Sequence, residues 1–177
     1  MKKVFMLFFF LSACMASPQK AFQLDSGDEV YLSQANEVEM VSMTKHFDVL
    51  PHIENQMPTS PEEAISEWVE KHLKASKTGT KKVWIVVYRA EMLQTDLPNE
   101  SMFKLDEVNY TLNYKLEIQV RKDGQVIKRV PVEGKGFVVI AKKASLSKKE
   151  KAWAKLIQKM LTHLETKIKE NIIASQG

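Results

Sequence analysis

The stretch Val108-Asn-Tyr-Thr-Leu-Asn-Tyr-Lys-Leu-Glu-Ile-Gln-Val-Arg121 decides the fold of this chain. Apolar and polar side chains alternate through all fourteen residues without a break. Because successive side chains of a β-strand point to opposite faces, this period of two predicts one long strand. One face of the strand is buried and the other is exposed.

Three further strands are predicted around this one. A partner strand over residues 125–140 follows the Asp-Gly turn at 122–124, and three of its residues favour a bulge or an edge position: Pro131, Gly134 and Gly136. The earlier segment Val83–Tyr88 has apolar side chains on both faces, as in a central strand covered on both sides or in an intermolecular contact. Residues 38–43 favour a first strand.

Two helices are predicted from capping residues and apolar stripes. Ser60-Pro-Glu-Glu63 has Ser at the N-cap, Pro at the first helical position and Glu at the third, and a stripe follows it: Ile65, Trp68, Val69 and Leu73. Ser147-Lys-Lys-Glu150 predicts the start of a longer helix reaching about Ile173. Its stripe contains eight apolar residues: Trp153, Leu156, Ile157, Met160, Leu161, Leu164, Ile168 and Ile172.

These elements predict an α+β fold in the order β-α-β-β-β-α. An antiparallel sheet of about four strands with two helices packed on one face is the economical arrangement, because each helix has one apolar stripe to bury. The chain then divides into residues 1–13 as a lipoprotein signal peptide, 14–36 as a lipidated N-terminus and flexible tether, and 37–177 as a single α+β periplasmic domain.

The N-terminus has the anatomy of a secretory signal. Lys2 and Lys3 precede the apolar run Val4–Leu11, and this run is far shorter than the ~20 residues of a membrane-spanning helix. Leu11-Ser-Ala-Cys14 resembles the lipobox of bacterial lipoproteins, in which the cysteine is diacylated and becomes the first mature residue. The alternative is ordinary cleavage after Ala16, which would release a soluble secreted protein.

The lipobox resemblance also implies a location. Cys14 is the only cysteine of the chain, so it cannot form an internal disulfide and is available for acylation. The next residue is Met15, whereas an Asp at this position commonly retains bacterial lipoproteins in the inner membrane. We therefore expect a lipid anchor in the inner leaflet of the outer membrane, with the domain facing the periplasm and a protein of the envelope as its partner. Nucleic acid is not expected as a partner, given the modest net charge of +4.

Signals for an enzyme are weak. The four histidines show no spacing typical of metal ligands, and no cysteine is available to join them: His46, His52, His72 and His163. His52 with Glu54 is at most a fragment of a site. We therefore predict no catalytic residue, no metal and no cofactor.

One charge pattern is a candidate binding surface. Lys148, Lys151, Lys155 and Lys159 recur on one face of the second predicted helix, distinct from its apolar stripe. A basic amphipathic helix can lie on an anionic membrane surface. The alternative, which we expect, is a solvated face of a helix that packs on the sheet.

Short motifs across the chain resemble a family of uncharacterised proteobacterial lipoproteins. They are Pro51-His52 with Met57-Pro58, Ser60-Pro61 leading to Trp68, and Ala144-Ser145-Leu146 with Trp153. The resemblance implies no assigned activity. The element order is also similar to that of the lipoprotein subunit of the lipopolysaccharide-export translocon and of auxiliary lipoproteins of lipid-transporting ABC systems. We therefore expect a non-catalytic accessory in envelope assembly or lipid trafficking, with a lipid- or glycan-binding module as the alternative.

The anchor is testable through Cys14. Cys14→Ser should abolish metabolic labelling with palmitate and release the domain from the membrane fraction, because two acyl chains supply the stable anchoring. A wild-type protein that is unlabelled, cut after Ala16 and soluble in the periplasm would contradict the lipoprotein assignment.

Overall fold

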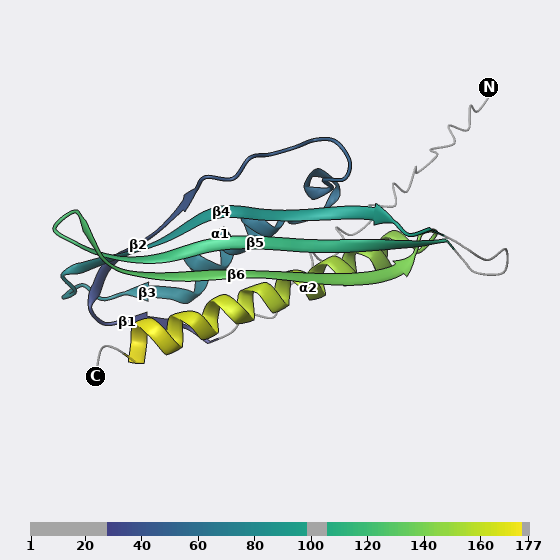
Figure 1. The fold of residues 1–177 in the computed structure, drawn as a ribbon. Coiled ribbons are helices and arrows are strands. Elements are labelled where there is room, and N and C mark those ends of the chain that lie inside the picture. Colours follow the sequence, from purple (N-terminus) through teal and green to yellow (C-terminus); the bar gives the residue numbers. More distant parts are fainter. Residues whose placement is uncertain (1–27, 99–105, 175–177) are drawn as a thin grey trace, which may run out of the picture.

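The structure is a computed structural model and describes residues 28–98 and 106–174. The predicted signal peptide, Cys14 and most of the predicted tether lie outside these residues. A mixed four-stranded sheet dominates the fold, in the order β2-β4-β5-β6 (Figure 1). Its strands are β2 (Ala35–Ser42), β4 (Lys81–Asp96), β5 (Glu107–Lys122) and β6 (Gln125–Ala141).

The long alternating stretch forms β5, as predicted, and it lies between β4 and β6. Both neighbours run antiparallel to it. The turn to β6 contains Asp123 and Gly124 at φ angles of 50° and 79°. Positive φ at both central residues matches the right-handed twist of the flanking strands, which explains why the Asp-Gly signal located this hairpin.

The α+β class and the packing of both helices on one face are confirmed, and one strand pairing differs from the expected antiparallel sheet. β2 runs parallel to β4, with Val38 opposite Val83 and Ser42 opposite Val87. Parallel neighbours need a crossover of a dozen or more residues, usually with a helix. Residues 43–80 supply this crossover and contain α1 (Pro61–His72).

The folded domain also begins earlier than the predicted tether allowed. β1 (Val30–Leu32) pairs in parallel with β3 (Leu73–Ala75) in a second, two-stranded sheet. The side chains of Val30 and Leu32 are buried in the core. The proposed boundary at residue 36 is therefore wrong, because a three-residue strand without a clear period gives no local signal.

The predicted capping box forms at the start of one helix and is absent at the start of the other. At α1, Ser60 Oγ accepts from the Glu63 N–H at 3.2 Å and Glu63 Oε2 accepts from the Ser60 N–H at 2.8 Å, the predicted capping box. The expected box at Ser147 does not form. α2 (Leu146–Ile168) instead begins after Ser145, whose carbonyl accepts from the N–H groups of residues 148 and 149. α2 continues into a π-helical turn, η2 (Lys169–Ile173).

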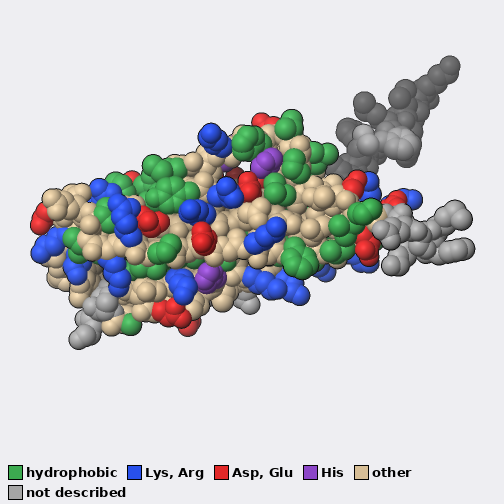
Figure 2. Space-filling view, viewed as in Figure 1, with side chains coloured by type: hydrophobic (Ala, Val, Ile, Leu, Met, Phe, Trp, Pro, Cys, Tyr) green, Lys and Arg blue, Asp and Glu red, His purple; other side chains and the backbone are tan. Residues whose placement is uncertain are grey.

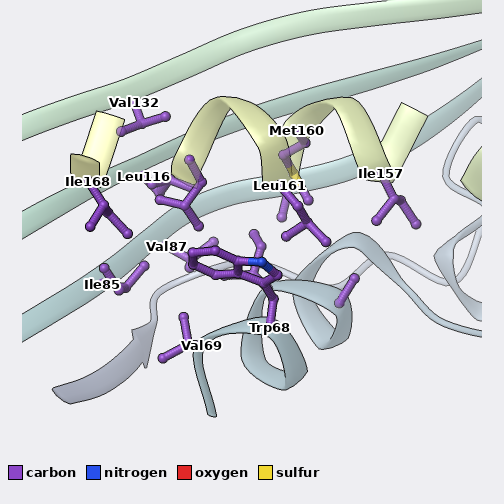
Figure 3. Packing of buried hydrophobic residues seen from close by; sticks show 14 of the residues in the cluster. Trp68, Val69, Ile85, Val87, Leu116, Val132, Ile157, Met160, Leu161 and Ile168 are labelled. Atoms are coloured by element: carbon purple, nitrogen blue, oxygen red, sulfur yellow. The ribbon is translucent and has the colours of Figure 1, made fainter. Parts of the chain in front are cut away.

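Both helices pack on the same face of the sheet and share one core. Trp68 of α1 lies among side chains of the sheet and of α2, including Val87 and Leu161 (Figure 3). At the other end of α2, the ring of Trp153 meets Tyr110 of β5 edge to face, with 5.4 Å between the ring centroids. Such pairs stabilise a core beyond the area that they bury. The two tryptophans therefore join the helices to the sheet.

Truncation of either tryptophan tests this packing. Trp68 and Trp153 are 5% and 3% exposed, so Trp68→Ala and Trp153→Ala should each lower the free energy of unfolding by about 3–5 kcal/mol. Leu146→Ala is the matched control, since Leu146 is 61% exposed and such sites usually change stability by less than about 0.5 kcal/mol. Chemical denaturation with both variants near wild-type stability would contradict the described core.

Candidate functional site

The sheet has two unlike faces, and the face turned away from α1 and α2 reaches solvent. Along β6 every second side chain is exposed from Gln125 to Val139, while the intervening residues are buried or half-buried against α2. Three of the exposed residues are large and apolar, namely Ile127 at 53%, Phe137 at 69% and Val139 at 40% exposure. The period of two that buries one face thus leaves these side chains without cover.

Phe137 and Val139 lie together at one end of this face. Phe137 lies opposite Thr111, which lies opposite Leu93, and Val139 lies one row further along. We call Leu93, Phe137 and Val139 the end patch. Figure 2 shows hydrophobic side chains on the surface where β4 and β6 end.

The other end of the same face is polar. Arg129 Nη1 donates to Glu117 Oε1 at 2.6 Å, and Gln119 donates to the same carboxylate oxygen at 2.7 Å. The guanidinium of Arg121 lies 4.1 Å from the ring centroid of Trp84, a cation–π contact. Ile127 is a single exposed apolar side chain at this end, whereas Phe137 and Val139 are neighbours in the end patch.

β6 forms an edge of the sheet, as its Pro and Gly residues predicted, and no described strand pairs with its outer side. Pro131 removes one backbone donor there, which limits pairing with other chains. The glycines serve the inner side. A Cβ on Gly134 would lie 2.4 Å from the Tyr114 hydroxyl, and a Cβ on Gly136 would lie 3.1 Å from Leu156 of α2. Glycine therefore lets the helix and Tyr114 approach the strand closely.

Tyr114 uses the space that Gly134 leaves. Its hydroxyl lies 2.7 Å from His163 Nδ1 of α2, in hydrogen-bond range. Burial raises the pKa of the Tyr114 phenol. The pair ties α2 to β5 through a polar contact under the edge strand, so we assign it a structural role.

A cleft of about 1030 Å³ opens beside β4, on the side of the sheet opposite the β6 edge. We call it the β4 cleft. Four segments line it: residues 42–48 after β2, residues 54–58 around η1 (Glu54–Gln56), the first turns of α1, and Tyr88–Glu91 of β4. Its lining is as polar as it is apolar.

The structure brings together the two residues that the sequence suggested as a site fragment. His52 Nδ1 lies 3.5 Å from Glu54 Oε1, and the ring of Phe47 stacks on His52 with 4.5 Å between centroids. Glu54 Oε1 also accepts the N–H of Met92 at 2.6 Å. His52 and Glu54 thus fasten the loop to β4 beside the cleft.

Other polar groups of the β4 cleft also have structural partners. Glu62 accepts from the hydroxyl of Thr44 and lies 3.6 Å from His46 Nε2. Glu91 lies 3.8 Å from Arg89 and accepts from Asn113 at 3.2 Å. Across residues 28–98 and 106–174, no group of three or more His, Cys, Asp or Glu side chains is placed to hold a metal.

The predicted lysine row is present on the surface of α2. Lys148, Lys151, Lys155 and Lys159 are all exposed, on the side of the helix opposite its buried stripe. No acidic residue lies in the first turn of α2, and no carboxylate pairs with any of the four lysines in the described part of the chain. The positive end of the helix dipole lies beside Lys148 and adds to the positive charge at that end of the row.

The predicted lipidation residue, Cys14, lies outside the described residues. No helix in the part of the chain that the structure describes is long and apolar enough to cross a membrane.

No protein-family model matches this chain, and no curated protein matches it. Several solved structures are similar to it, among them these three. A minor lipoprotein from Acinetobacter baumannii is 14% identical and aligns over 81% of this chain and 95% of its own, with a TM-score of 0.41. Rare lipoprotein B from Shewanella oneidensis is 12% identical over 80% and 93%, with a TM-score of 0.38.

The third is a neuraminyllactose-binding hemagglutinin homolog from Helicobacter pylori, 11% identical over 85% of this chain and 93% of its own, with a TM-score of 0.49. Two of the three neighbours are thus described as lipoproteins. The identities and TM-scores are too low to transfer a function, ligand or partner.

Two surfaces were not identified from the sequence. The period of β5 predicted one exposed face, but Pro131, Gly134 and Gly136 interrupt the pattern of β6, so its sequence did not identify Phe137 and Val139 as exposed. The β4 cleft has no such signal, because it joins residues 40–66 with residues 88–91.

The lysine row can be tested with vesicles. If the row is a solvated face, a variant with all four lysines changed to Gln should fold normally, and the delipidated domain should not sediment with anionic vesicles. Binding at low salt that disappears as salt is raised, and that is lost in the variant, would contradict this, since each lysine near an anionic surface contributes about 1 kcal/mol. A variant with Lys77, Lys115, Lys122 and Lys135 changed to Gln is the control of equal charge.

Proposed function

We propose that this chain is a lipid-anchored protein of the cell envelope that acts without catalysis. In this proposal it is an accessory of envelope assembly or lipid trafficking and works through contact with a protein partner. The lipobox Leu11–Cys14 supports the anchor. The single observation that supports the protein contact is the end patch, exposed on a sheet face that neither helix covers.

The character of this surface favours a protein over a small ligand. An exposed cluster of large apolar side chains is typical of a protein-contact surface. The outer edge of β6 lies beside it and offers backbone groups for pairing. The partner that fits is a protein with an apolar surface of its own, able to cover Phe137 and Val139.

The position of the anchor is consistent with such a contact. β1, the first described strand, packs beside η2 at the C-terminal end of α2. The end patch lies at the opposite end of the sheet (Figure 1). A chain anchored through residues before β1 can therefore hold one end of the domain near the membrane and present the patch away from it. We place the anchor in the inner leaflet of the outer membrane, with the domain in the periplasm.

The contacts of the β4 cleft support a non-catalytic role. Glu63 caps α1, Glu62 binds Thr44, and Glu54 bonds the backbone of β4. Carboxylates used in this way hold the loop and the helix in place.

A lipid- or glycan-binding module is the second candidate. The exposed lysine row favours it, because four lysines without a carboxylate partner in the described chain can meet anionic headgroups. Salt-sensitive vesicle binding, as described above, would place this candidate first.

The protein contact can be tested at Phe137. Phe137→Asp puts a charge into the end patch, so a partner that co-purifies with the lipidated wild-type protein from a detergent extract should be lost. Thermal stability should stay nearly unchanged, since substitutions at exposed sites usually change stability by less than about 0.5 kcal/mol. Ile127→Asp is the matched control, because Ile127 lies on the same strand at the polar end and is 53% exposed.

A photo-crosslinking residue at position 137 gives a second readout. It should crosslink the same partner in intact cells, whereas position 127 should not. A partner retained by Phe137→Asp, or crosslinked equally from both positions, would rule out the end patch as the contact.

A further inference from the structure

The β4 cleft exists because the ladder between β2 and β4 is interrupted. The ladder ends where the Met43 N–H donates to the Val87 carbonyl at 2.8 Å. The chain returns to the same edge of β4 at residues 51–53. There the Ile53 N–H donates to Met92 O at 3.1 Å, and Pro51 O accepts from the Gln94 N–H at 2.7 Å. Between these points, residues 44–50 leave the edge and run along the rim of the cleft.

The backbone N–H and C=O of one residue of β4, Ala90, are directed toward this gap. Met92 and Gln94 direct their N–H groups away from β5, toward Glu54 and Pro51. From Arg89 onward the β4–β5 register is regular, so the alternation of an antiparallel ladder gives Ala90 the same orientation. Ala90 is 8% exposed and lines the cleft. No backbone or side chain of the described residues bonds its N–H or C=O on that side.

Glu54 adds an unused acceptor at the same place. Its Oε1 bonds Met92, two residues along the edge from Ala90. Its Oε2 is buried and has no partner in the described part of the chain. The Ala90 backbone and Glu54 Oε2 are thus polar groups beside the cleft that no described residue bonds, and a group entering the cleft can bond both.

The charge of the cleft indicates the sign of that group. Five carboxylates line it, against one lysine and one arginine: Asp48, Glu54, Glu62, Glu63 and Glu91 against Lys45 and Arg89. A cation is therefore favoured. Phe47 and Tyr88, both partly exposed at the cleft, provide aromatic surface for the stem or plane of a basic side chain.

We propose that the β4 cleft binds an extended, basic segment of a partner protein by strand addition. One residue of the segment pairs its N–H and C=O with those of Ala90, and an adjacent lysine or arginine side chain donates to Glu54 Oε2. Main-chain bonds at an open sheet edge supply affinity in this mode of recognition, and the side chain supplies specificity. The end patch is a separate surface, so an experiment that excludes binding at one of the two surfaces does not exclude binding at the other.

The test uses the lipidated full-length protein in detergent and capped, fluorescein-labelled peptides of about ten residues. The first peptide alternates threonine and valine around one central arginine. The second has citrulline, which is uncharged and nearly isosteric, in place of arginine. The third is N-methylated at the residue that would pair with Ala90. Fluorescence anisotropy should show binding of the first peptide and much weaker binding of the other two.

Two variants locate the site. Glu54→Gln keeps an acceptor for the Met92 N–H but removes the charge, so it should weaken arginine-peptide binding roughly tenfold to hundredfold, as expected for a charge-assisted hydrogen bond. Glu133→Gln, an exposed carboxylate on β6, should change nothing. Phe137→Asp should also leave the affinity unchanged. The amide signal of Ala90 should shift when the peptide binds.

Several results would overturn the proposal. Equal affinity for the arginine and citrulline peptides would exclude the cation site, and undiminished binding of the methylated peptide would exclude pairing with Ala90. Failure of all three peptides to bind the wild-type protein would exclude the site itself. The peptide comparison uses the wild-type protein, so it tests the cation site and the pairing with Ala90 even if Glu54→Gln disturbs the loop.

Discussion

The burial of one face of β5 is the constraint on which the rest of the structure depends. From Val108 to Val120 every second side chain of this strand points toward the helices, and most of these side chains are almost completely buried. α1 and α2 cover this face, with Trp68 and Trp153 between helix and sheet. Gly136 of β6 follows from the same requirement, because a Cβ there would crowd Leu156 of α2.

Covering one face with both helices leaves the other face and the outer edge of β6 open. That asymmetry provides the surfaces to which we assign function. The end patch lies on the open face, and the outer edge of β6 runs beside it. The N-terminal strand β1 lies at the opposite end of the molecule, so an anchor and a contact surface can be separated by the length of the sheet (Figure 1).

The parallel pairing of β2 with β4 produces the other candidate surface. A parallel crossover has to leave one end of the first strand and return to the other end of its neighbour. β2 covers β4 only as far as Val87, while β4 continues to Asp96. The returning chain covers the edge again at Met92 and Gln94. The uncovered interval at Ala90 is therefore a direct consequence of the topology, and Glu54 lies at its border.

The sequence by itself determined the features that depend on neighbouring residues: the strand from its period of two, the start of α1 from the contacts of Ser60 with Glu63, and the β5–β6 hairpin from Asp123-Gly124. It also indicated the lipobox at Cys14. Only the tertiary structure decided which strands pair, because β1 with β3 and β2 with β4 meet across long stretches of chain. The exposure of Phe137 depends on which face of β6 the helix α2 covers, and the gap at Ala90 lies between two segments that bond the same edge of β4. The physical cause of both is pairing and packing between elements that are distant in sequence, which no local pattern encodes.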